Sequence, residues 1–423
     1  MQVFKFGGAS VKDSEGVINL GNILRAHGKM PLLVVVSAMG KTTNRLEALL
    51  NAYVNHQDNA LALLAGIKEY HDTIAKALFD DPAHPVFDDL SNLFVEIEWI
   101  LEEPAQDPYD YLYDQIVSVG ELLSTKIVSH YLTSQHLPNT WLDARGYVAT
   151  DNNYREATVN WEETQQRIRT DIPRLLETQF VITQGFIGST SENFTTTLGR
   201  EGSDYSAAIF ASCLDAESVT IWKDVPGVLN ADPKWFDHTE LIPELSYLDA
   251  IELTYYGATV IHPKTIKPLQ NKNISLYVRS FLEHSNGGTH IRTTKETLPV
   301  PSFIFKVNQV LVSILPRDFS FIVEDNLSDI FKLFHKHKIK INMMHNSAVS
   351  FSVSIDNTGE NVHLLMNELK ERYQVESKSD LELITIRYYN QSTIDRVLVD
   401  KQTIMELKDS YTCQLLVSSK TGN

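Results

Sequence analysis

The chain has 423 residues, 43% of them hydrophobic, which is too long for one compact core and predicts at least two domains. Its 54 acidic residues against 37 lysines and arginines give a net charge of −17, which argues against general binding to nucleic acid or anionic membranes. The cysteines Cys213 and Cys413 lack metal-ligand spacing, so we expect reduced thiols rather than disulfides or a zinc site. Because no apolar run reaches the ~20 residues that span a bilayer and no leader pattern precedes the first strand, we expect a cytoplasmic protein.

The first ten residues join a short apolar strand to the sequence KFGGAS, residues 5–10. Two glycines directly after a strand have no Cβ atoms, so backbone N–H groups can approach an anion, and Lys5 adds a positive charge. This pattern indicates a phosphate site. The glycine pair alone leaves open a second interpretation, a tight strand-to-helix turn beside a solvated lysine.

Strand and helix patterns alternate along the next two hundred residues. Apolar or β-branched runs predict strands at 3–6, 32–36, 180–183 and 219–222. Apolar residues recur at helical spacing after Thr43 and after Asp204, which predicts an amphipathic helix at each place. The alternation is typical of an α/β fold, a mainly parallel sheet with helices on both faces. In such sheets ligands bind beyond the carboxyl ends of the strands.

Two loops and one helix carry charged residues suited to a small ligand. Arg200 lies in the loop LGREGSDYS before a helix, where a guanidinium can hold a carboxylate or phosphate. Glu121 is the one acid among hydroxyls on a helix face and suits an ammonium group. The loop KDVPGVLNADPK, residues 223–234, follows a strand and suits a nucleotide. Each feature alone has an equally good or better explanation without a ligand. The Arg200 loop could simply hold an exposed arginine, the Glu121 helix could present a solvated face, and residues 223–234 could form an ordinary turn.

The segment SAMGKTTN, residues 37–44, contains Gly-Lys-Thr but is not a P-loop. The motif GxxxxGK[ST] requires a glycine where this chain has Val35, inside a predicted strand. The hydroxyls of Ser37 and Thr43 remain available to a substrate.

The C-terminal third has a different organisation. Turn-formers and prolines over 285–302 mark a domain boundary. Beyond it the pattern predicts strands at 310–315, 339–343, 349–355 and 381–388, with helices around 327–334 and 362–369. The order βαββαβ is typical of a ferredoxin-like module, whose topology by itself specifies no function. The remaining residues predict a short helix near Ile404 and Leu407 and a strand at 411–417, too few for a second complete module.

Together the N-terminal loops resemble those of the aspartokinases of the amino acid kinase family. KFGGAS, SAMGKTTN, LGREGSDYSAA and KDVPGVLNADPK, followed by GATVIHPKTI, occur in the family's order, and the resemblance covers essentially the whole chain. It implies an amino acid kinase catalytic domain over 1–296, then ferredoxin-like ACT modules over 303–423, the first at about 305–388 and the second reduced. It also implies a monofunctional aspartate kinase that phosphorylates the β-carboxylate of L-aspartate with ATP and Mg2+, the first step of lysine, threonine and methionine biosynthesis.

The resemblance assigns roles to the residues that match the family's motifs. Lys5 and Asp204 would be catalytic, with Lys5 on the transferring phosphoryl group. Substrate binding would involve Ser37, Thr43, Glu121, Arg200 and Ser203. Nucleotide binding would involve Lys5, Gly7, Gly8, Ser10, Lys223, Asp224, Gly227, Asp232 and Lys234. Mg2+ would be carried by the nucleotide phosphates, and its protein ligands are not identified.

The chain departs from the family at two positions near the phosphates. Ala9 replaces a threonine, and Thr259 replaces the lysine of the family's GAKV sequence. One phosphate cation is therefore missing. We predict that Lys223 takes its place, with Lys234 and then Lys264 as the next candidates.

ACT modules imply an amino acid effector and a homodimer or higher homo-oligomer. We expect dimerisation through the strand at 349–355. Lysine-sensitive relatives have acids where this chain has Asn342 and Ala348, which argues against inhibition by lysine and leaves the effector open.

Two other functions fit the same residues less well. Another amino acid kinase, acting on acetylglutamate or glutamate, is disfavoured for N-acetylated substrates, because the charge of Glu121 is useful only opposite a free ammonium. A non-catalytic amino acid sensor with the kinase fold is disfavoured because Lys5, Arg200, Asp204 and Glu121 are all retained.

Overall fold

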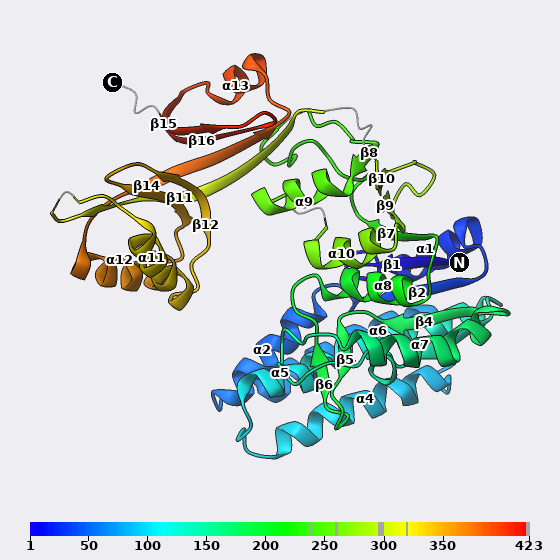
Figure 1. Ribbon diagram of the computed structural model, residues 1–423. Coiled ribbons are helices and arrows are strands. Elements are labelled where there is room, and N and C mark those ends of the chain that lie inside the picture. The colour runs from blue at the N-terminus through cyan, green and yellow to red at the C-terminus, as the bar shows by residue number, and fades with distance from the viewer. Residues whose placement is uncertain (237, 259–260, 295–299, 319, 420–423) are drawn as a thin grey trace. The chain divides into compact units, whose positions relative to one another are not determined.

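The computed structural model describes residues 1–236, 238–258, 261–294, 300–318 and 320–419, which form two compact units. The first unit comprises Met1–Val228, Leu241–Ile251 and Val260–Thr297 (Figure 1). The second comprises Leu229–Glu240, Glu252–Thr259 and Leu298–Asn423. Two segments from the range 1–296 thus belong with the C-terminal residues, which local patterning could not indicate.

The first unit is built on a mainly parallel sheet, as predicted. In the described residues its strand order is β3-β4-β2-β1-β7-β9-β10-β8. The strands from β3 to β9 are mutually parallel, whereas β10 runs antiparallel to β9 and parallel to β8. Their bounds are Gln2–Phe6 for β1, Leu32–Val36 for β2, Asn139–Leu142 for β3, Phe180–Gln184 for β4, Ser218–Lys223 for β7, Glu244–Ser246 for β8, Ser275–Ser280 for β9 and Thr289–Arg292 for β10. A short hairpin, β5 (Ile187–Ser189) with β6 (Thr195–Thr197), follows β4.

Helices cover this sheet because its central strands are apolar on both faces. Every residue of β2 and β4 is buried, as in a strand with helices above and below it. The two amphipathic helices predicted from the sequence are present as α2 and α8. The helices are α1 (Ser14–His27), α2 (Thr42–Val54), α3 (Ala60–Leu78), α4 (Pro85–Glu102), α5 (Tyr109–Val117), α6 (Val119–Ser134), α7 (Trp161–Leu176), α8 (Gly202–Cys213), α9 (Tyr247–Tyr256) and α10 (Pro263–Asn271), with a 3-10 turn at Ala144–Gly146. No helix in the described ranges is long and apolar enough to cross a bilayer.

Helix α6 is central to the position of the candidate site. Its residues from Val119 to Thr125 are all buried, so the helix is enclosed on every side rather than lying at the surface. Gly120 makes this possible, because a Cβ there would lie 3.2 Å from the Cβ of Ala38 and 3.1 Å from Thr42. The solvated face that the sequence left open for Glu121 is therefore wrong.

The second unit contains an antiparallel sheet of order β12-β13-β11-β14-β16-β15 in its described residues. Its elements are β11 (Ser302–Pro316), α11 (Glu324–Lys336), β12 (Ile341–Asn346), β13 (Phe351–Asp356), α12 (Glu360–Arg372), β14 (Tyr373–Arg387), α13 (Gln391–Val397), β15 (Lys401–Lys408) and β16 (Thr412–Ser419). The first four strands in this order form the expected ferredoxin-like arrangement.

Strands β11 and β14 each run through two halves of this sheet. The half of β11 over 311–316 pairs with the start of β14 at 373–378, and Ser302–Lys306 pairs with Leu383–Arg387. The fourth strand of the first module is therefore 373–378 and not the predicted 381–388. The sequence missed this strand because its side chains are mainly polar and exposed. Residues 381–387 instead lie between 302–306 and β16.

One further expectation about this unit is corrected. Ile404 and Leu407 lie in strand β15, which pairs with β16, and the short helix is α13, which Asn390 caps. Met405 and Leu407 pack against a small apolar cluster, so tertiary contacts override the local helix pattern. Strand β13 is hydrogen-bonded to β11 and β12 on its two sides. The backbone of β13 therefore has no free edge that could pair with a strand of a second copy. Dimerisation through 349–355 by strand pairing would need such an edge.

Candidate functional site

The carboxyl ends of β1, β2 and β7 meet at one edge of the first sheet. Strand β1 lies between β2 and β7, with Lys5 opposite Val35 and Ile221. Beyond β1 the chain turns at once, since the Ser10 N–H donates to the Gly7 carbonyl at 2.9 Å. This edge is where parallel α/β sheets bind ligands.

The two glycines of the turn serve different purposes. A Cβ on Gly8 would lie 2.5 Å from the Ala38 carbonyl oxygen, which no side chain tolerates, and the Gly40 N–H donates to the Gly8 carbonyl at 2.9 Å. A Cβ on Gly7 would lie 3.5 Å from the Lys5 Nζ, an ordinary contact. Gly8 is thus required by packing of the turn against the loop after β2. Gly7 leaves open space beside the Lys5 ammonium.

Lys5 and Lys223 converge on one buried carboxylate, that of Asp204. The Lys5 Nζ lies 2.6 Å from Asp204 Oδ1, and the Lys223 Nζ lies 3.6 Å from Oδ2. Lys5 and Asp204 are 7% and 3% exposed, whereas Lys223 is partly exposed. Burial by itself would raise the pKa of Asp204, but the two ammonium groups outweigh it and hold that pKa below its usual value. Asp204 also lies in the first turn of α8, where the helix dipole favours a negative charge.

Glu121 is the second buried carboxylate of the region, and its surroundings are different. The Ala38 N–H donates to its Oε1 at 3.4 Å, and its Oε2 is buried with no hydrogen-bond partner in the described residues. Burial raises the pKa of Glu121 to about 8, although the charge of Lys5 acts in the opposite direction. A cation placed beside Oε2 would reverse this shift, because it would favour the ionised form.

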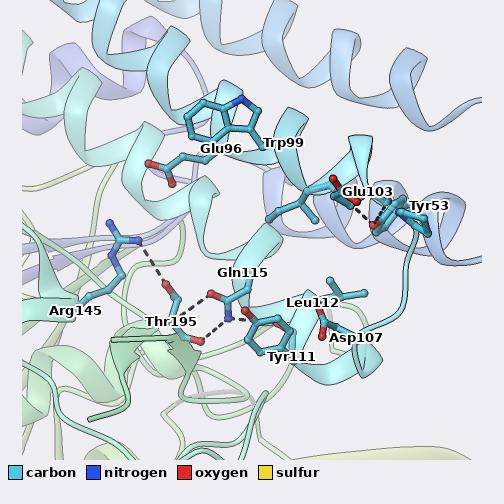
Figure 2. A pocket seen from close by; sticks show the side chains of 12 residues that line it. Tyr53, Glu96, Trp99, Glu103, Asp107, Tyr111, Leu112, Gln115, Arg145 and Thr195 are labelled. Atoms are coloured by element: carbon cyan, nitrogen blue, oxygen red, sulfur yellow. Dashed lines mark hydrogen bonds between the residues drawn. The ribbon is translucent and has the colours of Figure 1, made fainter. Parts of the chain in front are cut away.

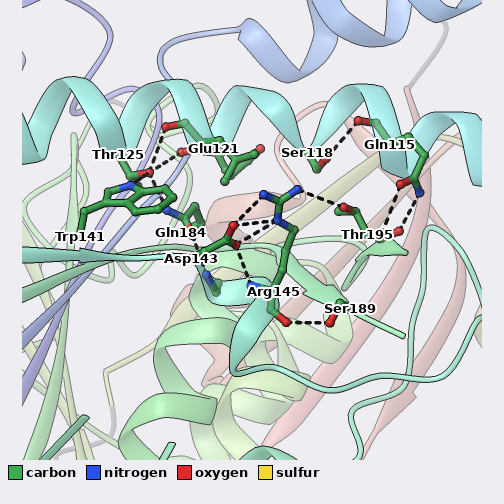
Figure 3. Close-up of polar contacts among 12 residues, drawn as sticks. Gln115, Ser118, Glu121, Thr125, Trp141, Asp143, Arg145, Gln184, Ser189 and Thr195 are labelled. Atoms are coloured by element: carbon green, nitrogen blue, oxygen red, sulfur yellow. Dashed lines mark hydrogen bonds and ion pairs between the residues drawn. The ribbon is translucent and has the colours of Figure 1, made fainter. Parts of the chain in front are cut away.

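A hydrogen-bond network fixes the helix that carries Glu121 (Figure 3). Thr125 Oγ1 donates to the Glu121 carbonyl at 2.9 Å and accepts from Gln184 Nε2 at 2.7 Å and from Trp141 Nε1 at 2.9 Å. Gln184 Oε1 in turn accepts the Ala144 N–H at 2.7 Å. Gln184 was not among the residues predicted from the sequence. Its position as the last residue of an apolar strand was a usable signal, because that is where α/β sheets place functional side chains.

The other residues predicted to bind substrate lie directly after β2, in the first turn of α2 and around the start of α8. Ser37, Thr43 and Ser203 are half-buried, and Ser203 packs so closely on Gly185 that a Cβ there would lie 2.5 Å from the Ser203 Cβ. Arg200 is exposed, and no described carboxylate lies within ion-pair distance of it. Its guanidinium can therefore receive an acidic ligand without first breaking an internal ion pair.

The structure divides the predicted nucleotide residues between the two units. Ser10 Oγ donates to the Trp222 carbonyl at 3.4 Å, which ties the glycine turn to β7, and Asp224 is exposed directly after that strand. Gly227 has a φ of 153° and packs against Thr289, where a Cβ would lie 2.7 Å from the hydroxyl oxygen.

Asp232 and Lys234 belong to the second unit. There the Asp232 carboxylate accepts the Lys234 N–H at 2.9 Å within an exposed turn. Thr259, where the family lysine is replaced, lies outside the described residues. In the ranges that the structure describes, no group of three or more His, Cys, Asp or Glu side chains is arranged to hold a metal ion.

A separate cavity of about 440 Å3 lies beside α4 and α5 (Figure 2). At one side of it Gln115 Nε2 donates to the Thr195 carbonyl at 2.9 Å, and Arg145 Nη1 donates to the Thr195 hydroxyl at 3.4 Å. Arg145 is also paired with Asp143 at 2.6 Å. None of the predicted site residues lines this cavity, so it is distinct from the strand-end site.

Comparison with known proteins gives a family and a fold. The model of the amino acid kinase family matches residues 1–280. Lysine-sensitive aspartokinase 3 of Escherichia coli (strain K12) is 29% identical over 394 residues, which cover 91% of this chain and 86% of that protein. The chloroplastic bifunctional aspartokinase/homoserine dehydrogenase 1 of Zea mays is 35% identical over 295 residues, 68% of this chain and 32% of that protein. The chain spans about a third of the length of this maize relative.

Solved structures agree with this result. E. coli aspartokinase III in complex with aspartate and ADP matches with a TM-score of 0.82 at 27% identity, over 99% of this chain and 96% of that one. The complex of that enzyme with lysine and aspartate also gives a TM-score of 0.82, at 28% identity and with the same coverage. The expected fold class is confirmed, an amino acid kinase fold followed by an antiparallel region consistent with ACT modules.

Proposed function

Since the chain belongs to the amino acid kinase family, we propose that it is an aspartate kinase. It transfers the γ-phosphoryl group of ATP to the β-carboxylate of L-aspartate, giving 4-phospho-L-aspartate and ADP, the first step of lysine, threonine and methionine biosynthesis. The observation that carries this proposal is the buried pairing of Lys5 and Lys223 with Asp204 beside the glycine turn. The likeness to aspartokinases along nearly the whole chain supports it.

The chemistry needs charge neutralisation rather than a general base. The nucleophile is a carboxylate with a pKa of ~3.9, which is already ionised at neutral pH. One of its oxygens forms a bond to the γ-phosphorus, and the bond to the β–γ bridging oxygen breaks, so ADP leaves with that electron pair and no proton moves. Positioning and electrostatic stabilisation supply the catalysis. The ammonium groups of Lys5 and Lys223 supply positive charge, and Asp204 orients Lys5.

Glu121 accounts for the preference for a free amino group. Its Oε2 is buried and lacks a partner in the described residues, so the substrate ammonium supplies the missing contact. An N-acetylated substrate has no such cation and leaves a desolvated acid unpaired. We therefore assign aspartate rather than an acetylated amino acid as the acceptor.

Arg200 holds the substrate α-carboxylate, with hydroxyls from Ser37, Thr43 and Ser203 around it. The nucleotide is held by the glycine turn, by Lys223 at the end of β7, and by Asp224 and Gly227, which follow β7 in the first unit. The roles of Asp232 and Lys234 stay predictions from the sequence. Mg2+ would be carried into this site by the nucleotide phosphates. When bound, it neutralises phosphate charge that Lys5 and Lys223 meet only in part.

The remaining assignments extend this proposal. Residues 1–296 form the catalytic domain and 303–423 the regulatory region, with an amino acid effector whose identity is open. Action in the cytoplasm and assembly into a homo-oligomer stay predictions.

Replacing Arg200 by alanine tests the role assignment directly. We expect a loss on the order of 2 to 5 kcal/mol in transition-state stabilisation, because one carboxylate contact disappears. The measurement is ATP-dependent aspartyl phosphate formation, trapped as the hydroxamate. Arg174→Ala, at an exposed arginine on α7, is the matched control and should retain activity. Nearly intact turnover in Arg200→Ala would contradict the assigned role.

A substrate panel separates the competing functions. With ATP and Mg2+, aspartate should react while glutamate and N-acetylglutamate do not. Turnover of either of the latter would identify another amino acid kinase. Binding of amino acids without any turnover would identify a sensor that has kept the fold. Adding lysine, threonine and methionine to the same assay shows whether the second unit responds to an effector.

A further inference from the structure

A second cavity, of about 570 Å3, lies along the helices on one side of the first unit. Helix α8 packs against both α7 and α10 (Figure 1). The cavity is lined by residues of these three helices, by Lys272 at the end of α10 and by residues 156–159. None of the residues assigned above to substrate or nucleotide lines it. Its volume is within the range of small-molecule sites.

One part of the cavity wall is aromatic. Trp161, the first residue of α7, and Tyr205 of α8 both line it, with ring centroids 6.4 Å apart and planes at 68°. Trp161 is 38% exposed, which is high for a tryptophan and leaves a ring face available for contact. A planar, weakly polar group such as a nucleobase can stack on such a surface.

Another part of the wall carries positive charge. Lys264, Lys267 and Lys272 line the cavity from one face of α10 and its C-cap. Over eight residues this row extends about 12 Å at ~1.5 Å per residue. Lys272 is paired with Asp215 at 2.7 Å, and across the described ranges no carboxylate lies within ion-pair distance of Lys264 or Lys267. In a chain of net charge −17, such a row favours a polyanion.

We propose that this cavity binds a nucleotide, with its base against Trp161 and Tyr205 and its phosphates along the α10 lysines. Glu156, the single lining carboxylate, accepts hydrogen bonds from sugar hydroxyls. The site goes beyond the proposed kinase function, because it is separate from the strand-end site and its ligand is an effector rather than a substrate.

The cavity is connected to the Arg200 loop through two short links. The His262 N–H donates to the Glu201 carboxylate at 3.0 Å, and His262 Nδ1 accepts the Lys264 N–H at the start of α10. Across the loop, a Cβ on Gly199 would lie 3.4 Å from the Glu156 side chain. A nucleotide that contacts α10 and Glu156 therefore acts on both sides of Arg200. We expect it to change the KM for the carboxylate substrate more than kcat.

The binding test uses the full chain and ADP as the probe, with tryptophan fluorescence as the readout. ADP should change the emission of Trp161, and Lys267→Glu should weaken this response at least tenfold. Lys29→Glu, at an exposed lysine after α1, is the matched charge control and should leave the response unchanged. Adenosine and pyrophosphate should each bind at least tenfold more weakly than ADP, because each supplies only half of the recognised chemistry. Equal binding of adenosine, or tighter binding of an aromatic carboxylate, would overturn the assignment to a nucleotide.

Stoichiometry and a Lys5 variant separate this proposal from the kinase proposal. Equilibrium dialysis should give two ADP molecules per wild-type chain and one per Lys267→Glu chain. Trp161→Phe should abolish the fluorescence change and keep two bound molecules. Lys5→Ala should lose the strand-end site and keep the Trp161 signal, so a failed kinase assay leaves this test intact. One ADP per wild-type chain, with an unchanged affinity in Lys267→Glu, would rule the second site out.

Discussion

Two buried carboxylates in the first unit have opposite electrostatics. Asp204, on α8, faces the ammonium groups of Lys5 and Lys223, and its pKa is held below its usual value. Glu121, on α6, has one weak backbone contact and a pKa raised to about 8. Both are almost fully buried, so exposure does not explain the difference. The number of positive charges beside each carboxylate explains the difference between the two pKa shifts.

The contrast indicates that the two carboxylates have different roles. Asp204 already has its counter-charges, so it can hold Lys5 in place before any ligand arrives. Glu121 lacks a counter-charge and gains one only when a cation binds. Under the proposed function, such a site would be pre-organised toward the phosphate and receptive toward the substrate ammonium group.

The largest expected effect follows from removing the carboxylate that has two partners. Asp204→Ala leaves the buried Lys5 ammonium without its ion pair, so we expect a loss of about 3 to 5 kcal/mol in the free energy of unfolding. Chemical denaturation at pH 7 measures it. The double variant Asp204→Ala with Lys5→Met should recover much of this loss, because no buried charge is then left unpaired. If Asp204→Ala is as stable as wild type, the buried ion pair of Lys5 and Asp204 does not contribute to the free energy of unfolding.

The next effect tests the carboxylate without a counter-charge. Glu121→Gln removes an acid that burial keeps protonated near neutral pH, so we expect little change in folding stability at pH 7. The affinity for aspartate should fall on the order of 100-fold, because the ammonium loses an ionised partner. Isothermal titration with aspartate and a non-hydrolysable ATP analogue measures this. Unchanged affinity would remove Glu121 from the substrate site.

The same residue gives a pH dependence whose sign is opposite to that of Asp204. Between the ordinary glutamate pKa of 4.5 and about 8, the folded chain keeps the Glu121 proton that the unfolded chain has released. Stability should therefore fall as pH rises through this window, by at most ~1.4 kcal/mol per pH unit, and Glu121→Gln should remove that slope. For Asp204, whose pKa is lowered, stability is present above pH ~4 and is lost on acidification. Denaturation curves from pH 5 to 8 on the wild type and on Glu121→Gln measure the difference between their slopes of stability against pH.

The smallest expected effect concerns Lys223, the more distant partner of Asp204. Because it is partly exposed and lies 3.6 Å from the carboxylate, Lys223→Ala should change stability by less than ~1 kcal/mol. The KM for ATP should rise about tenfold, since a phosphate cation is lost. Lys223→Arg should restore most of the affinity. An unchanged KM would turn attention to Lys234, because Lys264 lines the separate α10 cavity.

Local patterning predicted strands β1, β2, β4 and β7 of the first sheet and helices α2 and α8, because apolar runs and helical periodicity are properties of short segments. It did not predict β3, β8, β9 and β10. It failed where a strand is polar, at 373–378, and where a helix-like pattern packs as a strand, at 401–408. In both places pairing with a distant strand decides the structure. The same reason explains why continuity along the chain could not indicate that segments 229–240 and 252–259 belong to the second compact unit.

The sequence by itself determined the alternating α/β order, the phosphate-type turn at Gly7 and Gly8, and the motifs that link the chain to the aspartokinases. Tertiary structure alone decided that Gly8 is required by packing, that two ammonium groups contact Asp204 and that burial raises the pKa of Glu121. Motifs are read from neighbouring residues, whereas burial and counter-charges come from residues far apart along the chain. The charge state of a buried acid depends on burial and counter-charges, so it cannot be read from a motif.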